Sequence, residues 1–455
     1  MCCGNINGTW ICKGKGCTMK GNILNIITDN YCNSKLKIIS ESAIVGILTG
    51  FTAVSYRYLL EKSLTFAHFM YTAEFKNLWL FPVVTAALAA AGYLVGCIVK
   101  SDSMVAGSGI PQVEGILAGK LSMNWYKVIL KKFAAGIIAI GAGLSLGREG
   151  PSVQIGAAVG QGVGRLFKGT DSEKKLLITG GASAGLAAAF NAPLAGCIFA
   201  LEEIHKNFSP KILVPAFLAS IISDFITEQL LGVSPVFNFG SVRILPLKYY
   251  GYIIVFGIIL ALGGALFNKS LLKSQDIYNR IKFLNVKNKP VMAFLIAGVM
   301  GLVLPQVLGG GHDLVSTLAA SNMTIKALLI ILIGKFLFTM SSYGSGTPGG
   351  IFLPLLVIGA LLGNIYGNII NILFGFDLQY VNNLLILGMA GYFASVVKSP
   401  ITGIVLIIEM TGVFDNLLSV SVVCITAYIF SDILNSRPVY ELLLNKILNN
   451  KGKHS

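Results

Sequence analysis

Long apolar runs follow one another along most of the 455-residue chain, separated by short polar breaks. The most apolar runs are Ala43–Val54, Leu80–Val99, Ile212–Ile222, Tyr252–Leu266, Val291–Leu304, Ile325–Phe338 and Leu417–Phe430. Several approach the ~20 residues that an α-helix needs to cross the hydrocarbon core of a bilayer. A membrane β-barrel would instead show alternating segments of about ten residues. The pattern therefore predicts an all-α polytopic membrane protein.

Breaks rich in glycine, proline and asparagine divide the chain into helices of unequal length. In the first half we predict helices over 39–61, 78–99, 107–116, 124–141, 149–166, 173–190, 192–204 and 212–231. A long helix over 249–283 joins the halves, and the second half continues with 290–304, 324–341, 351–372, 382–397, 400–411 and 416–433. Many pieces are too short to span a bilayer. Broken helices at membrane depth are tolerated only where the irregular backbone is buried or lines a polar cavity.

The composition supports a membrane protein, because 54% of the residues are hydrophobic, only 12% are charged and the mean hydropathy is +0.74. The net charge of +15 does not indicate nucleic-acid binding, since the basic residues lie in short loops and tails. The main clusters are Lys269, Lys273, Arg280, Lys282, Lys287 and Lys289, and Lys446, Lys451 and Lys453. Basic loops mark the cytoplasmic side. We expect cytoplasmic segments at 1–38, 269–289 and 444–455, in the inner or plasma membrane of the cell.

The N-terminal segment is rich in cysteine, since five of the eight cysteines precede the first membrane run. Their spacing fits no zinc site, and no histidine pair lies nearby. We interpret residues 1–18 as an upstream extension or a disordered tail; acylation of Cys2 and Cys3 is an alternative. We expect no cleavable signal peptide, because the first apolar segment starts too late. No metal, cofactor or enzyme signature is predicted from the sequence.

The two halves of the chain carry the same pattern of small residues. The segment 147–157 aligns with 350–360 at a constant offset of 203, and the match extends to Lys132 and Lys335. A second pair, 193–196 and 400–403, follows at an offset of 207, with Glu202 and Glu409 in equivalent places. Internal repeats of this kind are typical of transporters whose substrate site lies where the halves meet. We predict two inverted-topology repeats with broken, partly non-spanning helices, over 39–248 and 249–443.

Three predicted helices start with glycine and proline: at 107–111, 147–151 and 349–354. The first turn of a helix has unpaired N–H groups and the positive end of the helix dipole. Such starts bind anions without a fixed cation. A transported anion must be compensated for its lost hydration and must also leave again, so distributed partial charges suit transport. The alternative is that each motif is a helix break required for close packing.

From about Ser40 to Leu443 the chain resembles the CLC family of chloride channels and chloride/proton exchangers. The motifs that carry the resemblance are Gly-Ser-Gly-Ile-Pro at 107–111, Gly-Arg-Glu-Gly-Pro at 147–151, Gly-Gly-Ile-Phe-Leu-Pro at 349–354, and a late Tyr440. The resemblance implies a chloride site in which Ser108 and Tyr440 donate hydroxyl groups. It also implies backbone contributions from Gly109, Ile110, Arg148, Glu149, Gly150, Ile351 and Phe352. Serine at 108 resembles the chloride-preferring version, whereas proline there accompanies nitrate preference.

Glu149 matches the gating glutamate of the family. A carboxylate at a helix N-terminus in an anion site mimics the substrate and can leave when it is protonated, although it can also act as a simple helix cap. An ionisable residue inside the membrane is a functional candidate by default. The equivalent residue in the second repeat is Phe352, which cannot titrate. The two repeats are therefore expected to differ in role.

Glu203 matches the inner proton-transfer glutamate of the exchangers, a position where channels generally lack a carboxylate. Without the resemblance, Glu202 and Glu203 would be interpreted as an interfacial pair beside His205 and Lys206. Glu202, and with it Glu114, is expected to line the same water route. Glu409, the repeat mate of Glu202, is expected to be structural.

Lys132 and Lys335 are expected to raise the electrostatic potential along the anion path, since a lysine in an apolar helix is costly unless it serves a site. The alternative is that both extend to an interface. One departure from the family pattern is Gln112, where many relatives carry glutamate. The chain ends 15 residues after Tyr440, so no cytoplasmic regulatory module is expected.

Together these features predict chloride/proton exchange, and the resemblance implies a homodimer with one pathway in each subunit. The predicted partners are chloride, protons and the lipid bilayer. A passive chloride channel is the first alternative, and Glu203 is the residue that distinguishes the two. An unrelated transporter of an organic anion is the second alternative, and the small residues of the motifs argue against the large cavity that it would need.

Overall fold

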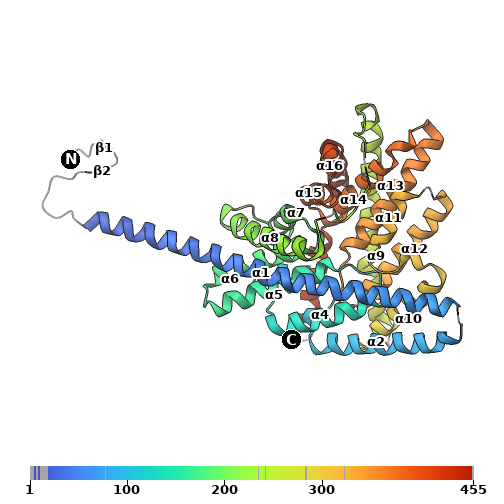
Figure 1. Ribbon diagram of the computed structural model, residues 1–455, viewed down its shortest axis with the longest axis horizontal. Helices are drawn as coiled ribbons and strands as arrows, with labels where there is room; N and C mark the ends of the chain where they lie inside the picture. Colours follow the sequence, from blue (N-terminus) through green and yellow to red (C-terminus); the bar gives the residue numbers. More distant parts are fainter. Residues whose placement is uncertain are drawn as a thin grey trace.

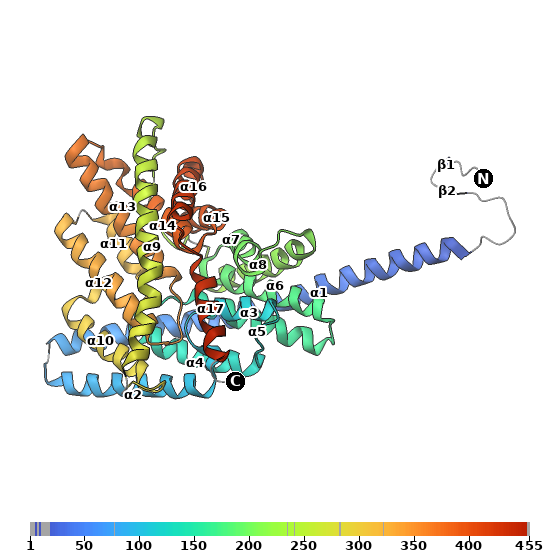
Figure 2. The same cartoon turned by 180° about the vertical axis from the view of Figure 1, so that it is seen from behind.

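The structure is a computed structural model that describes residues 5–6, 9–10, 19–76, 78–233, 235–240, 242–281, 284–321 and 323–452. The first half contains α1 (Met19–Lys76), α2 (Phe81–Ser101), α3 (Ile110–Leu117), α4 (Trp125–Gly141), α5 (Glu149–Leu166), α6 (Asp171–Phe190), α7 (Pro193–Phe199) and α8 (Pro210–Leu231). The second half contains α9 (Tyr250–Arg280), α10 (Lys289–Val303), α11 (His312–Ala320), α12 (Ile325–Gly344), α13 (Phe352–Phe374), α14 (Val381–Val397), α15 (Pro400–Thr411), α16 (Leu417–Ile433) and α17 (Val439–Gly452). The described chain is thus helical throughout its apolar part (Figures 1 and 2).

Short elements connect these helices. The 3₁₀ turns are η1 (Leu78–Leu80), η2 (Ser103–Val105), η4 (Leu247–Tyr249), η5 (Pro305–Val307), η6 (Leu378–Tyr380) and η7 (Phe414–Asn416), and η3 (Ala200–His205) is a π-helical turn that continues α7. Near the N-terminus, β1 (Asn5–Ile6) and β2 (Thr9–Trp10) form an antiparallel pair with Asn5 opposite Trp10. This pair was not predicted. The predicted acylation sites, Cys2 and Cys3, lie outside the described residues.

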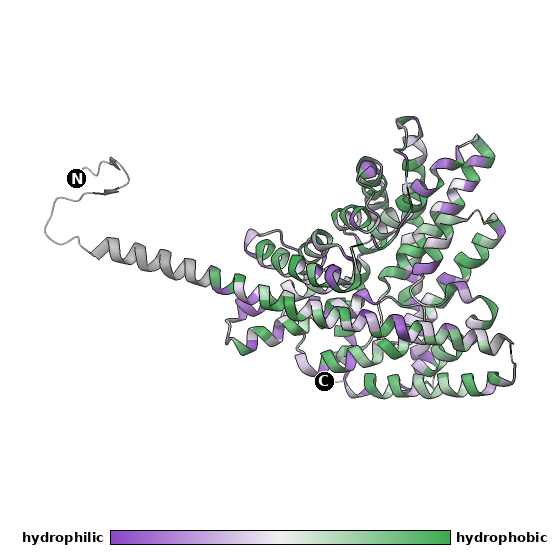
Figure 3. Ribbon diagram, viewed as in Figure 1, coloured by the Kyte–Doolittle hydropathy of each residue, from purple (hydrophilic) through white to green (hydrophobic). Residues whose placement is uncertain are grey.

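Eight helical segments are long and apolar enough to cross a membrane among the described residues. They are Lys35–Ala73, Phe81–Ser101, Pro210–Leu231, Leu247–Arg280, Ile325–Gly344, Phe352–Phe374, Leu378–Val397 and Phe414–Ile433. α13 and α14 are buried along most of their length, whereas α2 is largely exposed. Large apolar side chains such as Leu130 and Phe225 are exposed around the bundle, and Figure 3 shows apolar residues along its outer helices. The predicted all-α polytopic membrane architecture is confirmed.

Some predicted boundaries were wrong. α1 extends from Met19 to Lys76 instead of covering only 39–61. The hydropathy pattern marks only the apolar part of a helix, so it misses polar turns added at either end. The predicted helix over 192–204 is divided between α7 and η3. α11 and α17 were not predicted, because they are short and follow glycine or proline breaks.

The two repeats meet at their equivalent residues. Gly147 and Gly350 form an isolated antiparallel bridge, in which each N–H donates to the carbonyl of the other at 2.7 Å. These are the residues that the offset of 203 pairs in the sequence, so the bridge lies on the pseudo-two-fold axis between the repeats. Because the bridge is antiparallel, the two equivalent segments run in opposite directions where they meet, as expected for inverted repeats.

Close helix pairs occur in both repeats. In the first, Gly156 of α5 faces Gly181 of α6, and an added Cβ at either would overlap the backbone carbonyl of the other. In the second, Gly359 of α13 faces Gly388 of α14 in the same way. Small residues allow helix backbones to approach closely, which is how membrane helices gain packing energy. The repeated glycines thus hold α5 and α13, the helices that begin at the centre of the molecule.

A reciprocal pair of carboxylates joins α7 to α15. Glu409 of α15 accepts hydrogen bonds from the N–H groups of Leu194 (3.2 Å) and Ala195 (2.7 Å) at the start of α7. Glu202 of η3 accepts them from Ile401 (3.3 Å) and Thr402 (2.7 Å) at the start of α15. Each glutamate satisfies the unpaired first-turn donors of the other helix. Both residues therefore have a structural role in this arrangement.

Candidate anion and proton pathway

Three helix starts meet at the centre of the molecule. α3 begins at Ile110 after Gly109, whose φ of 99° is accessible to glycine at little cost. α5 begins at Glu149 and α13 at Phe352, on the two sides of the Gly147–Gly350 bridge. The loop before α3 lies close to the start of α5, as shown by Gly150, where an added Cβ would overlap Ser108 Oγ. The three segments singled out in the sequence are thus brought together.

Two hydroxyl groups in this region are buried without a partner. The residue exposures of Ser108 and Tyr440 are 1% and 0%, and neither hydroxyl makes a hydrogen bond within the described chain. Tyr440 is carried by α17, which packs on α3 where Leu444 faces Gly115. Buried polar groups are nearly always hydrogen-bonded in native proteins. Two unpaired hydroxyls at one centre are therefore free to donate to a ligand.

Phe352 fills the place that glutamate has in the first repeat. Its ring packs against Phe190 (centroid distance 5.2 Å), Phe199 (5.9 Å) and Phe393 (4.8 Å). Phe199 also lies edge-on to the ring of Tyr440 at 6.4 Å. The aromatic cluster makes one side of the centre apolar and leaves the backbone N–H groups of α13 as its polar contribution.

Glu149 is fully buried between the starts of α5 and α13. A Cβ added at Gly147 would overlap its carboxylate and would lie 3.2 Å from the backbone N of Leu353. No side chain of the described residues donates a hydrogen bond to either carboxylate oxygen. The carboxylate therefore occupies the position where two helix dipoles favour a negative charge.

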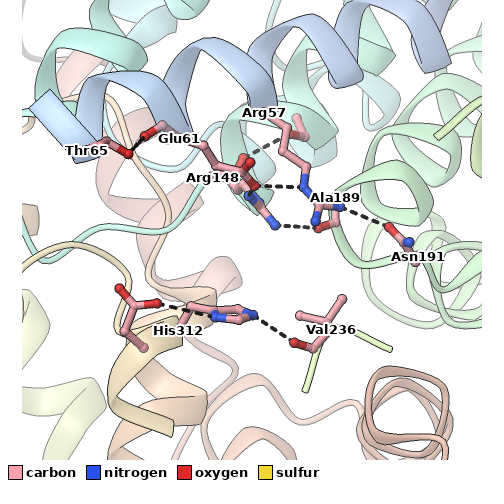
Figure 4. A network of polar contacts seen from close by, with 10 residues as sticks. Arg57, Glu61, Thr65, Arg148, Ala189, Asn191, Val236 and His312 are labelled. Carbon is pink, nitrogen blue, oxygen red and sulfur yellow. Dashed lines mark hydrogen bonds and ion pairs between the residues drawn. The ribbon is translucent and has the colours of Figure 1, made fainter. Parts of the chain in front are cut away.

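The side chain of Arg148 is held by residues outside the three helix starts. Its guanidinium donates to Glu61 Oε1 at 3.0 Å and to the carbonyl of Ala189 at 3.4 Å (Figure 4). Only the backbone of Arg148 is therefore available to the central site. This agrees with the expectation that backbone N–H groups, and not a fixed cation, bind the anion.

Lys132 and Lys335 are fully buried and have equivalent surroundings. Lys132 Nζ donates to the carbonyls of Val105 (3.0 Å) and Gly107 (2.6 Å). Lys335 Nζ donates to the carbonyls of Val307 (3.0 Å) and Gly309 (2.7 Å). Neither ammonium group reaches an interface, so the alternative of snorkelling is wrong for both. Each lysine holds the loop that precedes a glycine-opened helix.

This symmetry reveals a fourth helix start that the sequence analysis missed. Gly309 and Gly311 precede α11 with φ values of 60° and 97°, as Gly107 and Gly109 precede α3 with 60° and 99°. α11 is therefore the second-repeat counterpart of α3. The sequence signal was weak, because the offset changes to 202 here and glycine-rich runs are common in this chain. The lysines, each 25 or 26 residues after its glycine, were the usable signal.

Glu203 is buried in the interior, with 3% exposure, instead of lying at an interface. Its Oε2 accepts a hydrogen bond from Ser399 of the second repeat at 2.7 Å, and its Oε1 has no partner within the described chain. Close to it, Lys206 pairs with Glu114 of α3 at 2.6 Å. Glu203 thus joins residues from both repeats and keeps one oxygen free.

A family model described as voltage gated chloride channel matches residues 91–432. The chain is 34% identical over 423 residues to an H(+)/Cl(-) exchange transporter ClcA of Citrobacter koseri, covering 91% of this chain and 89% of that protein. It is equally similar to the ClcA exchange transporter of Salmonella agona, with 34% identity over 427 residues. The chain belongs to the CLC family. The predicted resemblance is confirmed.

Solved structures of CLC proteins have the same fold. A slow cyanobacterial Cl⁻/H⁺ antiporter superposes with a TM-score of 0.87 at 29% identity, covering 91% of this chain and 99% of the other. A CLC-type fluoride/proton antiporter gives a TM-score of 0.72 at 23% identity, covering 88% and 96% of the two chains, and supports the fold alone. The CLC family model covers Ser108, Glu149 and Glu203, whereas Tyr440 lies after its last matched residue.

Proposed function

We propose that this protein exchanges chloride for protons across a membrane. The observation that carries the proposal is the second buried carboxylate, Glu203, with one free oxygen on the same chain as the buried Glu149. A passive channel needs a gate but no second titratable group in its interior. The CLC relatives described above are named as exchange transporters, which supports the same choice.

Chloride would cross at the junction of the helix starts. The hydroxyls of Ser108 and Tyr440 and the first-turn N–H groups of α5 and α13 would replace its lost water. The contributing residues are Ser108, Gly109, Ile110, Arg148, Glu149, Gly150, Ile351, Phe352 and Tyr440. None of them places a full positive charge on the ion, so the ion is stabilised without being held.

Protons would use the two carboxylates in turn. Protonation of Glu149 removes its negative charge from the helix starts, so the side chain can leave and an anion can enter in its place. Glu203 would supply or accept that proton from the other side of the membrane. Glu202 is assigned a smaller part, because both of its oxygens are occupied by the start of α15.

A chloride gradient should therefore drive protons uphill. Purified protein is reconstituted in liposomes that are loaded with high chloride and placed in low chloride at equal pH. As chloride leaves, protons should enter the liposomes, so a pH electrode in the outer medium should record a rise in pH. Chloride efflux without proton movement would favour the passive channel instead.

We also propose that two copies associate through the face formed by α7, α8, α15 and α16. α7 and α15 are only 7 and 12 residues long, too short to span the bilayer by themselves. Leu194 and Ile401 on these helices are 42% and 47% exposed. A second copy would cover them. The mass of the protein in detergent, measured by light scattering, should correspond to a dimer.

The orientation follows from the basic residues. α9 spans 31 residues, roughly 46 Å of helix, and so exceeds the ~30 Å hydrocarbon core. Lys446 of α17 binds the late part of α9, at the carbonyl of Leu272 and at Asp276. We assign this end to the cytoplasm by the positive-inside rule, with both chain termini on that side, in the inner or plasma membrane.

A further inference from the structure

An open groove of about 590 Å³ lies between α2 of the first repeat and α10 of the second, which run side by side (Figures 1 and 2). The helices approach closely where Gly92 of α2 meets the backbone of Val291 and Gly96 meets the carbonyl of Lys287. Among the residues that line the groove are Ala89, Tyr93, Asn288, Val291, Met292 and Leu295. We name it the α2–α10 groove.

We propose that the α2–α10 groove binds one anionic phospholipid of the cytoplasmic leaflet. An acyl chain would lie in the apolar part of the groove, and the phosphate headgroup would lie among Lys100, Lys287 and Lys289. This site depends on the membrane orientation proposed above and not on chloride/proton exchange, so either can fail alone.

The basic residues lie at one end of the groove. Lys287 follows the basic end of α9, which is assigned to the cytoplasm, and Lys287 and Lys289 flank the lining residue Asn288. Lys100 lies two helical turns after the lining residue Tyr93 and therefore on the same face of α2. The positive end of the α10 dipole points to the same place, because α10 begins at Lys289.

The apolar part of the groove extends from this end toward the middle of the bilayer. Leu295 lies roughly 9 Å along α10 from Lys289, and Ala89 lies roughly 16 Å along α2 from Lys100. One leaflet contributes about half of the ~30 Å hydrocarbon core. The groove thus has the length and the polarity of a phospholipid in one leaflet.

The basic end of the groove has no acidic counterpart in the segments that form it. No aspartate or glutamate occurs in 75–101 or in 277–312. Asp102, which directly follows α2, lies 3.9 Å from the ammonium group of Lys131 instead. The lysines therefore attract a negative charge that the protein itself does not supply there.

Two of the lysines are positioned at the groove and keep their charge. Lys287 Nζ lies 5.7 Å from the centre of the Tyr93 ring, within the range of a cation–π contact. Lys289 Nζ donates to the neutral amide oxygen of Asn279 at 2.5 Å. Tyr93 is 47% exposed, and tyrosine is enriched where the hydrocarbon core meets the headgroups. Both ammonium groups can therefore donate charge-assisted hydrogen bonds to a phosphate.

These charges favour an anionic lipid over other occupants. A zwitterionic lipid would bring an ammonium group among three lysines, with no carboxylate of the two segments to accept it. A second copy of the chain would cover the apolar part but would carry no specific partner for the lysines, and the dimer proposed above uses a different face. A lipid with a net negative charge satisfies both parts of the groove.

Native mass spectrometry of the purified full chain measures how tightly single lipids bind. Wild-type protein should bind one phosphatidylglycerol per chain more tightly than phosphatidylcholine. Each basic residue near an anionic lipid contributes about fivefold in affinity, so Lys100→Gln combined with Lys287→Gln should weaken the binding of phosphatidylglycerol about 25-fold. The binding of phosphatidylcholine should change much less.

Lys269→Gln combined with Lys273→Gln is the matched control. These two lysines are exposed on α9, belong to the same basic cluster in the sequence and do not border the groove. The control removes the same number of charges and should bind phosphatidylglycerol as the wild type does. An equal loss in both double variants would overturn the site, because it would reveal only a general attraction to the basic end of the molecule.

Ala89→Phe tests the apolar part, because it fills the groove and keeps every charge. It should abolish the tight binding of phosphatidylglycerol. Unchanged affinity in this variant, or a wild-type protein that binds phosphatidylglycerol no more tightly than phosphatidylcholine, would reject the inference. Coupled transport of chloride and protons in liposomes, measured on the same preparations, tests the proposed function separately.

Discussion

At the scale of single residues, the proposed exchange depends on two buried carboxylates with different surroundings. Glu149 lies between two helix starts and has no side-chain partner in the described chain, whereas Glu203 keeps one hydrogen bond, to Ser399. The first is placed to compete with an anion and the second to pass a proton between repeats. Their roles separate cleanly in substitutions that keep the shape of the side chain.

Glu149→Gln should abolish proton movement and leave chloride movement, because an amide cannot carry a proton but can still vacate the site. Proton flux and chloride flux should be measured in the same liposomes. Uphill proton movement driven by chloride in this variant would reject Glu149 as the gate.

Glu203→Gln should stop or sharply reduce proton transport and keep anion transport with unchanged selectivity. The amide oxygen of glutamine can still accept the hydrogen bond from Ser399, so the fold is retained. If the purified variant couples chloride to protons as well as the wild type does, Glu203 is only a buried structural carboxylate.

Ser108→Pro should shift the preference from chloride toward nitrate, because it removes an unpaired hydroxyl donor and changes the loop before α3. The ratio of nitrate to chloride exchange rates is the measurement. An unchanged ratio would place Ser108 outside the anion path.

The sequence identified these candidate residues but not the way they are held. Glu149 and Ser108 were found through motifs at helix starts, where the local pattern of glycine and proline carries the information. The hydrogen bonds of Glu202 and Glu203 to α15 join residues about two hundred positions apart, and no local pattern encodes such contacts. Glu202 was expected to line a water route, but both of its oxygens are bound to helix α15.

At the scale of helices, the glycine contacts between α5 and α6 set the position of the central site. Most helix types and positions followed from hydropathy, since apolar runs of this length have few other structures available in a membrane. α11 and α17 were missed because they are short, with 9 and 14 residues, and follow glycine or proline breaks. The repeat offset aligned Gly147 with Gly350 but predicted no contact between them, and the structure joins them by two hydrogen bonds.

Gly156→Ala should destabilise the protein strongly, because the added Cβ would overlap the carbonyl of Gly181 and force α5 away from α6. We expect a loss of roughly 1–3 kcal/mol, typical of overpacking at a rigid contact. Thermal unfolding in detergent, followed by size-exclusion chromatography, measures the effect.

Gly251→Ala is the control, since nothing lies within 4 Å of a Cβ added at this helical position. It should be neutral or slightly stabilising, because alanine favours helix by up to about 1 kcal/mol over glycine. Equal melting temperatures for the two variants would show that the α5–α6 contact does not limit stability.

At the scale of the whole molecule, two inverted repeats with unequal residues make one asymmetric pathway. The pseudo-two-fold axis passes through the Gly147–Gly350 bridge. The residue equivalent to Glu149 in the second repeat is nevertheless Phe352, and the residue equivalent to Ser108 is Gly310. A titratable residue therefore lies at this helix start in one repeat only. The repeats supply the scaffold of helix starts, and the divergent residues make the two sides of the proposed pathway chemically different.

The most direct test of chloride/proton exchange is the reversal potential of the purified protein in a bilayer with a chloride gradient and a pH gradient applied together. Coupled exchange predicts a reversal potential that departs from the chloride equilibrium potential and moves when only the pH gradient is changed. A reversal potential that stays at the chloride equilibrium value at every pH gradient would contradict exchange and establish a passive chloride channel.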